Sequence, residues 1–119
     1  MEFMIQLYVS NAEEAIALYK EAFDAELKCI DYTPERTVLH SEIEAYGQKI
    51  AIATAEDTPV TGTVFQIDVK MKKEEDVRRA YEILKEDSVV NVPLGPCFFS
   101  PCMVDFVDKF KVRWCLFVI

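Results

Sequence analysis

The sequence is poor in basic residues, with 13 Lys plus Arg against 21 Asp plus Glu and a formal net charge of −8. Such an excess of negative charge repels phosphate backbones and anionic lipid, so we expect neither nucleic acid nor membrane as a partner. The chain has no apolar run near the roughly 20 residues that span a bilayer. Its first residues, MEFMIQ, lack the basic and apolar regions of a signal peptide. These absences predict a cytoplasmic protein.

Histidine occurs once, as His40, and the four cysteines form no CxxC pair. The spacing of Cys97 and Cys102 is too wide for CxxC redox chemistry, and no histidine cluster completes a zinc site. The 51% hydrophobic content is enough for an ordinary core, so no disulfide framework is needed. We therefore expect reduced thiols at all four cysteines: Cys29, Cys97, Cys102 and Cys115.

What the sequence does contain is an internal repeat. When the chain is shifted by 62 residues, Phe3 falls on Phe65 and Tyr19 falls on Tyr81. One offset aligns a segment of period 2, a segment of period 3.6 and a second segment of period 2. This pattern predicts two copies of one strand–helix–three-strand unit, without a gap between the copies.

Each copy can be divided into elements. Asn11 is a suitable N-cap, with Glu14 three residues later, and apolar residues follow at helical spacing to about Phe23. Tyr46 and Gly47 form an expected turn between two strands. In the first copy we expect strands over 3–9, 26–32, 37–44 and 48–54 and a helix over 11–23; in the second, strands over 64–69, 88–92, 100–107 and 111–118 and a helix over 73–86.

We expect the two copies to form a single α+β domain, residues 1–119, with modules 1–57 and 63–119 joined through 54–62. Neither copy should be stable alone, because each would leave one face of its sheet uncovered.

Three stretches resemble a known family: Asn11–Phe23, Val38–Ile43 and Asp108–Trp114. Together they are similar to the PhnB-like branch of the vicinal oxygen chelate superfamily, which includes glyoxalases, bleomycin-resistance proteins and dioxygenases. The resemblance implies paired, pseudo-symmetric βαβββ modules whose curved sheets form a cup, usually in a homodimer. Relatives often carry glycine where this chain has Val104 and Lys111, so we expect a differently shaped loop near the mouth of the cup.

Some members of the superfamily use a divalent metal held by the first and last strands of each module. Carried over to this chain, the four ligand positions are Met4, Ala53, Gln66 and Cys115. Alanine cannot bind a metal, and a thioether is a poor ligand for hard ions. We therefore expect no metal and no cofactor.

Alternation along the strands predicts the residues that line the cup. If Phe3, Ile5, Leu7 and Val9 pack beneath the helix, the residues that alternate with them along the strand point to the opposite face of the sheet. Cys102 is included because it lies 62 residues after His40. The predicted ligand-binding residues are Gln6, Tyr8, Gln66, Asp68, Cys102, Arg113, Cys115 and Phe117, and the predicted catalytic residues are His40 and Glu42.

Each of these candidates has a simpler interpretation. His40 could act as an acid–base group with Glu42, or it could be a strand histidine satisfied by its neighbours. Arg113 beside Gln66 and Asp68 could bind an anionic ligand, or it could belong to an Arg–Asp pair that fixes the two modules together. Cys102 and Cys115 could be reactive thiols or small buried hydrophobic residues.

Phe98 and Phe99, between Pro96 and Pro101, could form a lip over a pocket or pack in a dimer.

Two functions compete at this point. The leading one is metal-independent binding of a small molecule, apolar or aromatic, in the cup. The other is a lyase or isomerase that uses His40 and Glu42 as acid and base. A dimer with a structural or regulatory role and a filled cup is a third possibility.

Overall fold

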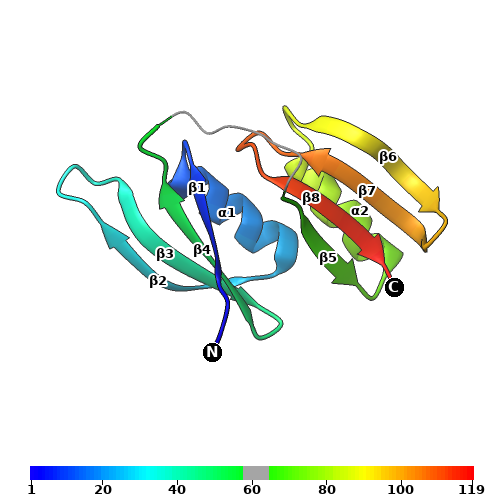
Figure 1. Cartoon of the computed structure of the whole chain (residues 1–119), viewed down its shortest axis with the longest axis horizontal. Coiled ribbons are helices and arrows are strands. Elements are labelled where there is room, and N and C mark those ends of the chain that lie inside the picture. Colours follow the sequence, from blue (N-terminus) through cyan, green and yellow to red (C-terminus); the bar gives the residue numbers. More distant parts are fainter. Residues whose placement is uncertain (58–64) are drawn as a thin grey trace. The chain divides into compact units, whose positions relative to one another are not determined.

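The computed structural model describes residues 1–57 and 65–119 and divides the chain into two compact units, Met1–Pro59 and Val60–Ile119 (Figure 1). The first unit contains β1 (Ile5–Val9), α1 (Ala12–Phe23), β2 (Glu26–Tyr32), β3 (Val38–Ala45) and β4 (Gln48–Thr54). The second contains β5 (Ile67–Met71), α2 (Glu74–Leu84), β6 (Val89–Cys97), β7 (Ser100–Val107) and β8 (Arg113–Val118). The predicted α+β class and its two βαβββ modules are confirmed. The single domain and the cup stay predictions.

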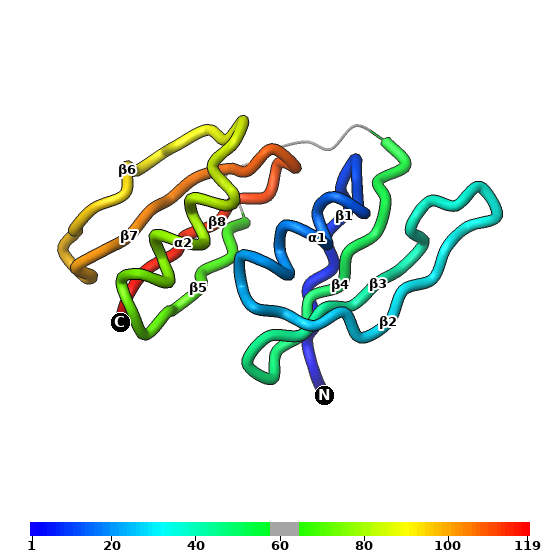
Figure 2. Tube along the Cα trace, turned by 180° about the vertical axis from the view of Figure 1, so that it is seen from behind, coloured from blue at the N-terminus to red at the C-terminus, as the bar shows by residue number. Residues whose placement is uncertain are grey.

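The two units share one topology. The strand order is β1-β4-β3-β2 in the first sheet and β5-β8-β7-β6 in the second. In each sheet the first and last strands of the unit pair in parallel, and the remaining pairs are antiparallel. Figure 2 shows each helix against one face of its own sheet. The opposite face of each sheet is therefore free of the unit's own helix.

The first helix begins and ends as its sequence predicts. The Asn11 side-chain oxygen accepts a hydrogen bond from the Glu14 backbone N–H at 3.1 Å, which satisfies one of the free donors of the first turn. The helix ends at Asp24, whose φ of 50° is left-handed. Among the described residues, no helix is long and apolar enough to cross a bilayer.

Alternation is correct for the end of the first strand, whereas Ile5, also predicted to pack beneath the helix, is 36% exposed. Leu7 and Val9 are buried, and Tyr8 between them is exposed. Phe3 is 94% exposed, so the prediction that it packs beneath the helix is wrong. The strand starts only at Ile5, and no pairing holds the residues before it. Val64, the predicted first residue of the strand in the second copy, lies outside the described residues.

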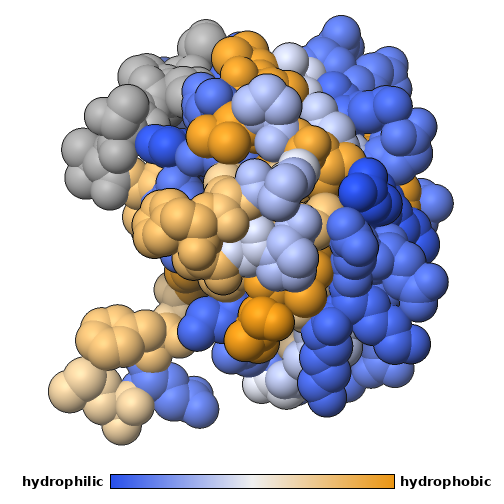
Figure 3. Space-filling model, turned by 90° about the vertical axis from the view of Figure 1, so that its right-hand side faces the viewer, coloured by the Kyte–Doolittle hydropathy of each residue, from blue (hydrophilic) through white to orange (hydrophobic). Residues whose placement is uncertain are grey.

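The second unit separates polar and apolar surface. The exposed side of α2 carries Arg78, Arg79, Glu82 and Lys85, as predicted, whereas the edge strand β6 exposes three valines, Val89, Val90 and Val92. Figure 3 shows hydrophilic side chains gathered along one flank of the side it displays and apolar ones beside them.

The two β-hairpins that end the units differ in length. In the first, Ala45 pairs with Gln48, so the turn contains only Tyr46 and Gly47, both with positive φ. In the second, Val107 pairs with Arg113, and five residues, 108–112, lie between them. The difference of three residues is odd, and side chains on a strand alternate between faces. An offset of 62 therefore predicts the wrong face of the sheet for residues of β7. The prediction of a repeat without a gap is wrong in this region.

The longer connection is organised around Asp108. This carboxylate is 2% exposed and accepts hydrogen bonds from the backbone N–H groups of Phe110 at 2.8 Å and Val112 at 3.0 Å. Its other oxygen accepts from the Trp114 indole N–H at 2.8 Å. The Asp108–Trp114 stretch is thus a structural motif that fixes the start of β8.

Lys111 in the same loop has a φ of 73°, a left-handed conformation that costs a residue with a Cβ about 1–2 kcal/mol. We predict that Lys111→Gly stabilises the protein by about 0.5–1 kcal/mol, because glycine removes this strain at some cost in backbone entropy. Urea denaturation measures the change. The control is Lys109→Gly, two residues earlier, where φ is not positive and glycine should destabilise. Equal effects at both positions would contradict the argument.

Candidate functional site

The open face of the first sheet is defined by its register. Gln6 pairs with Ala51, Ala51 with Glu42, and Glu42 with Cys29, so these four side chains form one row across the four strands. Residues opposite one another on neighbouring strands point to the same face. A second pairing joins Tyr8 to Ala53, and a third joins His40 to Asp31.

The structure thus places Gln6, Tyr8, His40 and Glu42 on one face, away from α1. Sequence reasoning missed Cys29 and Asp31 on this face. The alternation within β2 could have suggested them, but only the pairing of β2 with β3 sets them beside His40 and Glu42.

His40 and Glu42 are in direct contact. A ring nitrogen of His40, Nε2, lies 2.8 Å from Glu42 Oε2, and both side chains are partly buried. The hydrogen bond from His40 lowers the pKa of Glu42, burial opposes this, and the charge of Lys49, 3.7 Å from Glu42 Oε1, lowers it further. The net pKa lies below the ordinary value, so Glu42 stays ionised near neutral pH. Such a carboxylate can orient the imidazole.

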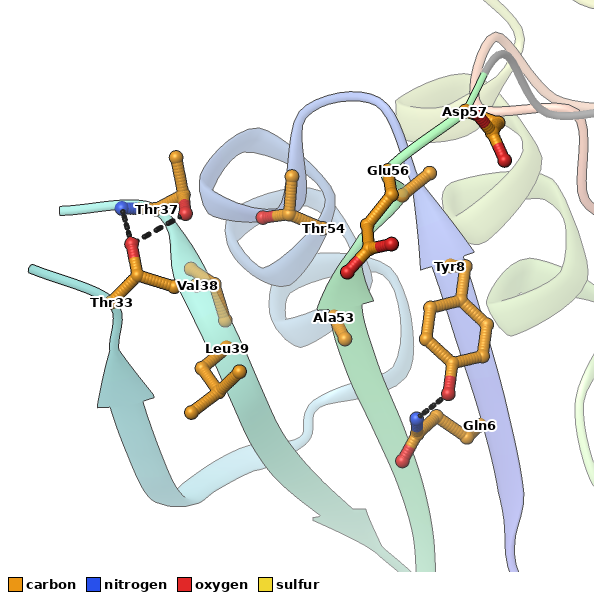
Figure 4. A pocket seen from close by; sticks show the side chains of 11 residues that line it. Gln6, Tyr8, Thr33, Thr37, Val38, Leu39, Ala53, Thr54, Glu56 and Asp57 are labelled. Atoms are coloured by element: carbon orange, nitrogen blue, oxygen red, sulfur yellow. Dashed lines mark hydrogen bonds between the residues drawn. The ribbon is translucent and has the colours of Figure 1, made fainter. Parts of the chain in front are cut away.

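Beside this pair, the first unit has an open hollow of about 830 Å³ (Figure 4). Ala53, which is 2% exposed, is at its base, with Gln6 and Tyr8 on one side and Leu39 and Thr37 across from them. The Gln6 amide donates a hydrogen bond to the Tyr8 hydroxyl. The remaining lining residues are Thr33, Val38, Thr54, Ala55, Glu56 and Asp57.

The lining of the hollow combines apolar and polar groups. Tyr8 is 60% exposed and offers an aromatic face. Thr33 and Thr37 share a hydrogen bond of 2.7 Å between their hydroxyls, which holds the β2–β3 connection in place. Glu56 and Asp57 add two carboxylates, and none of the lining residues that the structure describes is basic. The hollow therefore suits a neutral or cationic ligand with an apolar part.

The four positions at which relatives hold a metal do not form a metal site here. Met4 lies before β1 and offers only a thioether, and Ala53 has no donor. The Gln66 amide donates to Asp68 Oδ1 at 3.0 Å. Burial raises the pKa of the Cys115 thiol to about 11, with smaller contributions from nearby Asp68 and Asp105, so the thiol is protonated at neutral pH. The donors at these positions do not fit a divalent ion.

The open face of the second sheet contains most of the residues predicted there. Asp68 pairs with Cys115, and Cys115 pairs with Asp105. Phe117 lies on the same face, and its ring contacts Phe99 edge-on with centroids 5.2 Å apart. Gln66, Asp68, Arg113, Cys115 and Phe117 stay predicted ligand contacts of this unit.

Arg113 has a partner that sequence reasoning did not find. Its Nε and Nη2 donate to the two oxygens of Asp105 at 3.1 and 2.9 Å. Asn91 donates to the same carboxylate at 3.3 Å. Of the two interpretations, the structure shows an Arg–Asp pair, formed within the second unit and with Asp105 in place of Asp68.

The predicted position of Cys102 on the open face is wrong. Cys102 is fully buried and lies on the face that carries α2, where Arg78 and Glu74 are the charged groups that act on it. Burial raises the pKa of this thiol. The cause of the error is the longer β7–β8 connection, which sends residue 102 to the opposite face from His40.

Comparison with known proteins agrees with this architecture. A model of the Glyoxalase/Bleomycin resistance protein/Dioxygenase superfamily matches residues 3–116. The chain belongs to this superfamily.

Several solved structures have a similar fold. A PhnB protein from Bacillus cereus is similar over 100% of both chains, with 24% identity and a TM-score of 0.90. Protein PA1353 from Pseudomonas aeruginosa has 17% identity and a TM-score of 0.86, covering 99% of this chain and 97% of its own. The fosfomycin resistance protein FosX from Listeria monocytogenes has 18% identity and a TM-score of 0.75, covering 98% and 91%. No curated protein sequence matches the chain. At these identities the likeness concerns the fold alone.

The Asp105–Arg113 pair predicts a pH-dependent contribution to stability. Burial alone would raise the pKa of Asp105, but the hydrogen bonds from Arg113 and Asn91 lower it below its ordinary value. Because the folded pKa is depressed, the stabilisation is present above the unfolded pKa of about 3.9 and is lost as the pH falls through the folded pKa. We predict that Asp105→Asn costs about 1–3 kcal/mol at pH 7 and less at pH 3 than at pH 7.

Urea denaturation of both proteins at the two pH values gives the difference. The control is Glu82→Gln, which breaks the exposed ion pair between Glu82 on α2 and Lys85 just after it and should have little effect on stability at either pH. A cost for Asp105→Asn that is the same at both pH values would contradict the assignment.

Proposed function

We propose that the protein binds a small molecule in the hollow of the first unit and that this binding requires no metal. The observation that carries the proposal is a hollow of about 830 Å³ whose lining mixes an aromatic ring, small apolar residues and a few polar groups. Ligand pockets in general have this size and composition. Of the predicted ligand-binding residues, Gln6 and Tyr8 line it directly.

The charge of the lining indicates the class of ligand. Among the described residues that line the hollow, Glu56 and Asp57 are the only charged ones, and both are acidic. An anionic ligand would meet repulsion there, while a cation would be attracted. One structure of a FosX variant contains Mn(II) and dihydroxypropylphosphonic acid, a metal with an anionic ligand. We propose a neutral or cationic aromatic or apolar compound for this chain instead.

A lyase or isomerase is the second candidate, because His40 Nε2 and Glu42 Oε2 are 2.8 Å apart on the same open face. Glu42 would orient the imidazole, and His40 would transfer a proton to or from a bound substrate. This candidate requires a substrate that reaches from the hollow to His40. We propose further that the protein is a homodimer, as the resemblance implies, and that it acts in the cytoplasm.

A thermal-shift comparison of benzylamine and benzoate tests the leading proposal. The two compounds share a ring and differ in the sign of their charge. Benzylamine should stabilise the chelator-treated protein, by about 1 kcal/mol once its concentration is several times its Kd, and benzoate should not. Tyr8→Ala should weaken the effect, because Tyr8 is the aromatic group of the lining. The double variant Glu56→Gln, Asp57→Asn should reduce the preference for the cation.

Glu21→Gln is the matched control, because this acidic residue lies on α1 and outside the lining. Stabilisation that needs added metal, or that favours benzoate, would refute the proposal. Proton exchange into a bound compound that disappears in both His40→Gln and Glu42→Gln would favour the enzyme instead.

A further inference from the structure

Three different metal-binding side chains meet on the open face of the first sheet. The thiol of Cys29, a ring nitrogen of His40 and a carboxylate oxygen of Glu42 all lie within 4.8 Å of one another. Cys29 is exposed, and the other two are partly buried. None of the three is one of the positions at which relatives hold a metal, so the group is a separate feature of this chain.

Strand pairing sets the arrangement. Cys29 on β2 is the direct partner of Glu42 on β3, and His40 is two residues before Glu42 on the same strand face. Two donors bound to one tetrahedral zinc ion, with bonds of about 2.0–2.3 Å, lie roughly 3.3–3.8 Å apart. Donors that already lie within 4.8 Å of one another are therefore close to the spacing that a zinc ion requires.

The charged groups around the cluster leave one oxygen of Glu42 available to a divalent ion. Glu42 Oε2 faces His40, and its other oxygen, Oε1, lies 3.7 Å from Lys49 Nζ. The first oxygen can therefore bind a metal while the second keeps its contact with Lys49. Lys28, next to Cys29, is paired with Glu26 at 2.9 Å and Glu44 at 3.5 Å, which compensates its positive charge.

We propose that Cys29, His40 and Glu42 form a binding site for a zinc-class divalent cation. One thiolate, one imidazole and one carboxylate suit zinc or cobalt and disfavour magnesium and calcium, which prefer oxygen ligands alone. Binding replaces the His40–Glu42 hydrogen bond, and Cys29 gives up its proton to the solvent. Three protein ligands leave the fourth tetrahedral position open to water or to another donor. The site is independent of ligand binding in the hollow, which requires no metal.

Cobalt titration of the full, reduced and chelator-treated chain tests the site. Co²⁺ replaces zinc in such sites, and a thiolate ligand produces a charge-transfer absorption band. One equivalent should bind with this band. Cys29→Ser should abolish the band and weaken binding at least tenfold, since even indirect partners of metal ligands cost about 10–100-fold. His40→Gln and Glu42→Gln should also weaken binding.

Cys97→Ser is the matched control, because Cys97 is a partly exposed thiol in the second unit. It should keep both the band and the affinity. A band that survives in Cys29→Ser, a band lost in Cys97→Ser, or no band at one equivalent would overturn the site. If Cys29→Ser fails to fold by circular dichroism, His40→Gln decides: weaker binding supports the site, and unchanged binding overturns it.

Discussion

The parallel pairing of β1 with β4 is the constraint on which the first unit depends. A parallel pair cannot be joined by a tight turn, so the chain must cross over, and α1 supplies the crossover on one face of the sheet. The apolar side of α1 covers Leu7 and Val9. The other face is left with the alternate residues of four strands, and all the candidate chemistry of this unit lies there.

That face is organised by rows of paired residues. One row of paired side chains crosses all four strands. It contains the amide of Gln6, the methyl group of Ala51, the carboxylate of Glu42 and the thiol of Cys29. The small side chains of Ala51 and Ala53 on the middle strand leave space, and the hollow lies over Ala53. In the second unit the place of Ala51 is taken by Cys115, and Asp105 beside it is bound to Arg113. The two sheets thus share one topology, but the side chains on their open faces differ.

Much of the fold could be predicted from local signals. The Asn11 cap and the alternation around Leu7 are properties of short segments, and the structure contains both. What could not be predicted depends on pairing between segments. The register between β2 and β3 is interrupted twice, so the meeting of Cys29 with Glu42 cannot be counted from the sequence. The hairpin of the second unit is longer by an odd number of residues, so an offset of 62 predicts the wrong face for Cys102. The lining of the hollow includes loop residues such as Thr33, which belong to no periodic segment.

The most direct test of the account is amide chemical-shift mapping by nuclear magnetic resonance during a benzylamine titration without metal. Its central claim is that the open face of the first unit is the recognition surface. The account predicts saturable shifts concentrated in residues 6–8, 33–39 and 53–57, around the lining of the hollow. Shifts concentrated in α1 or in the second unit, or no saturable shifts at all, would contradict it.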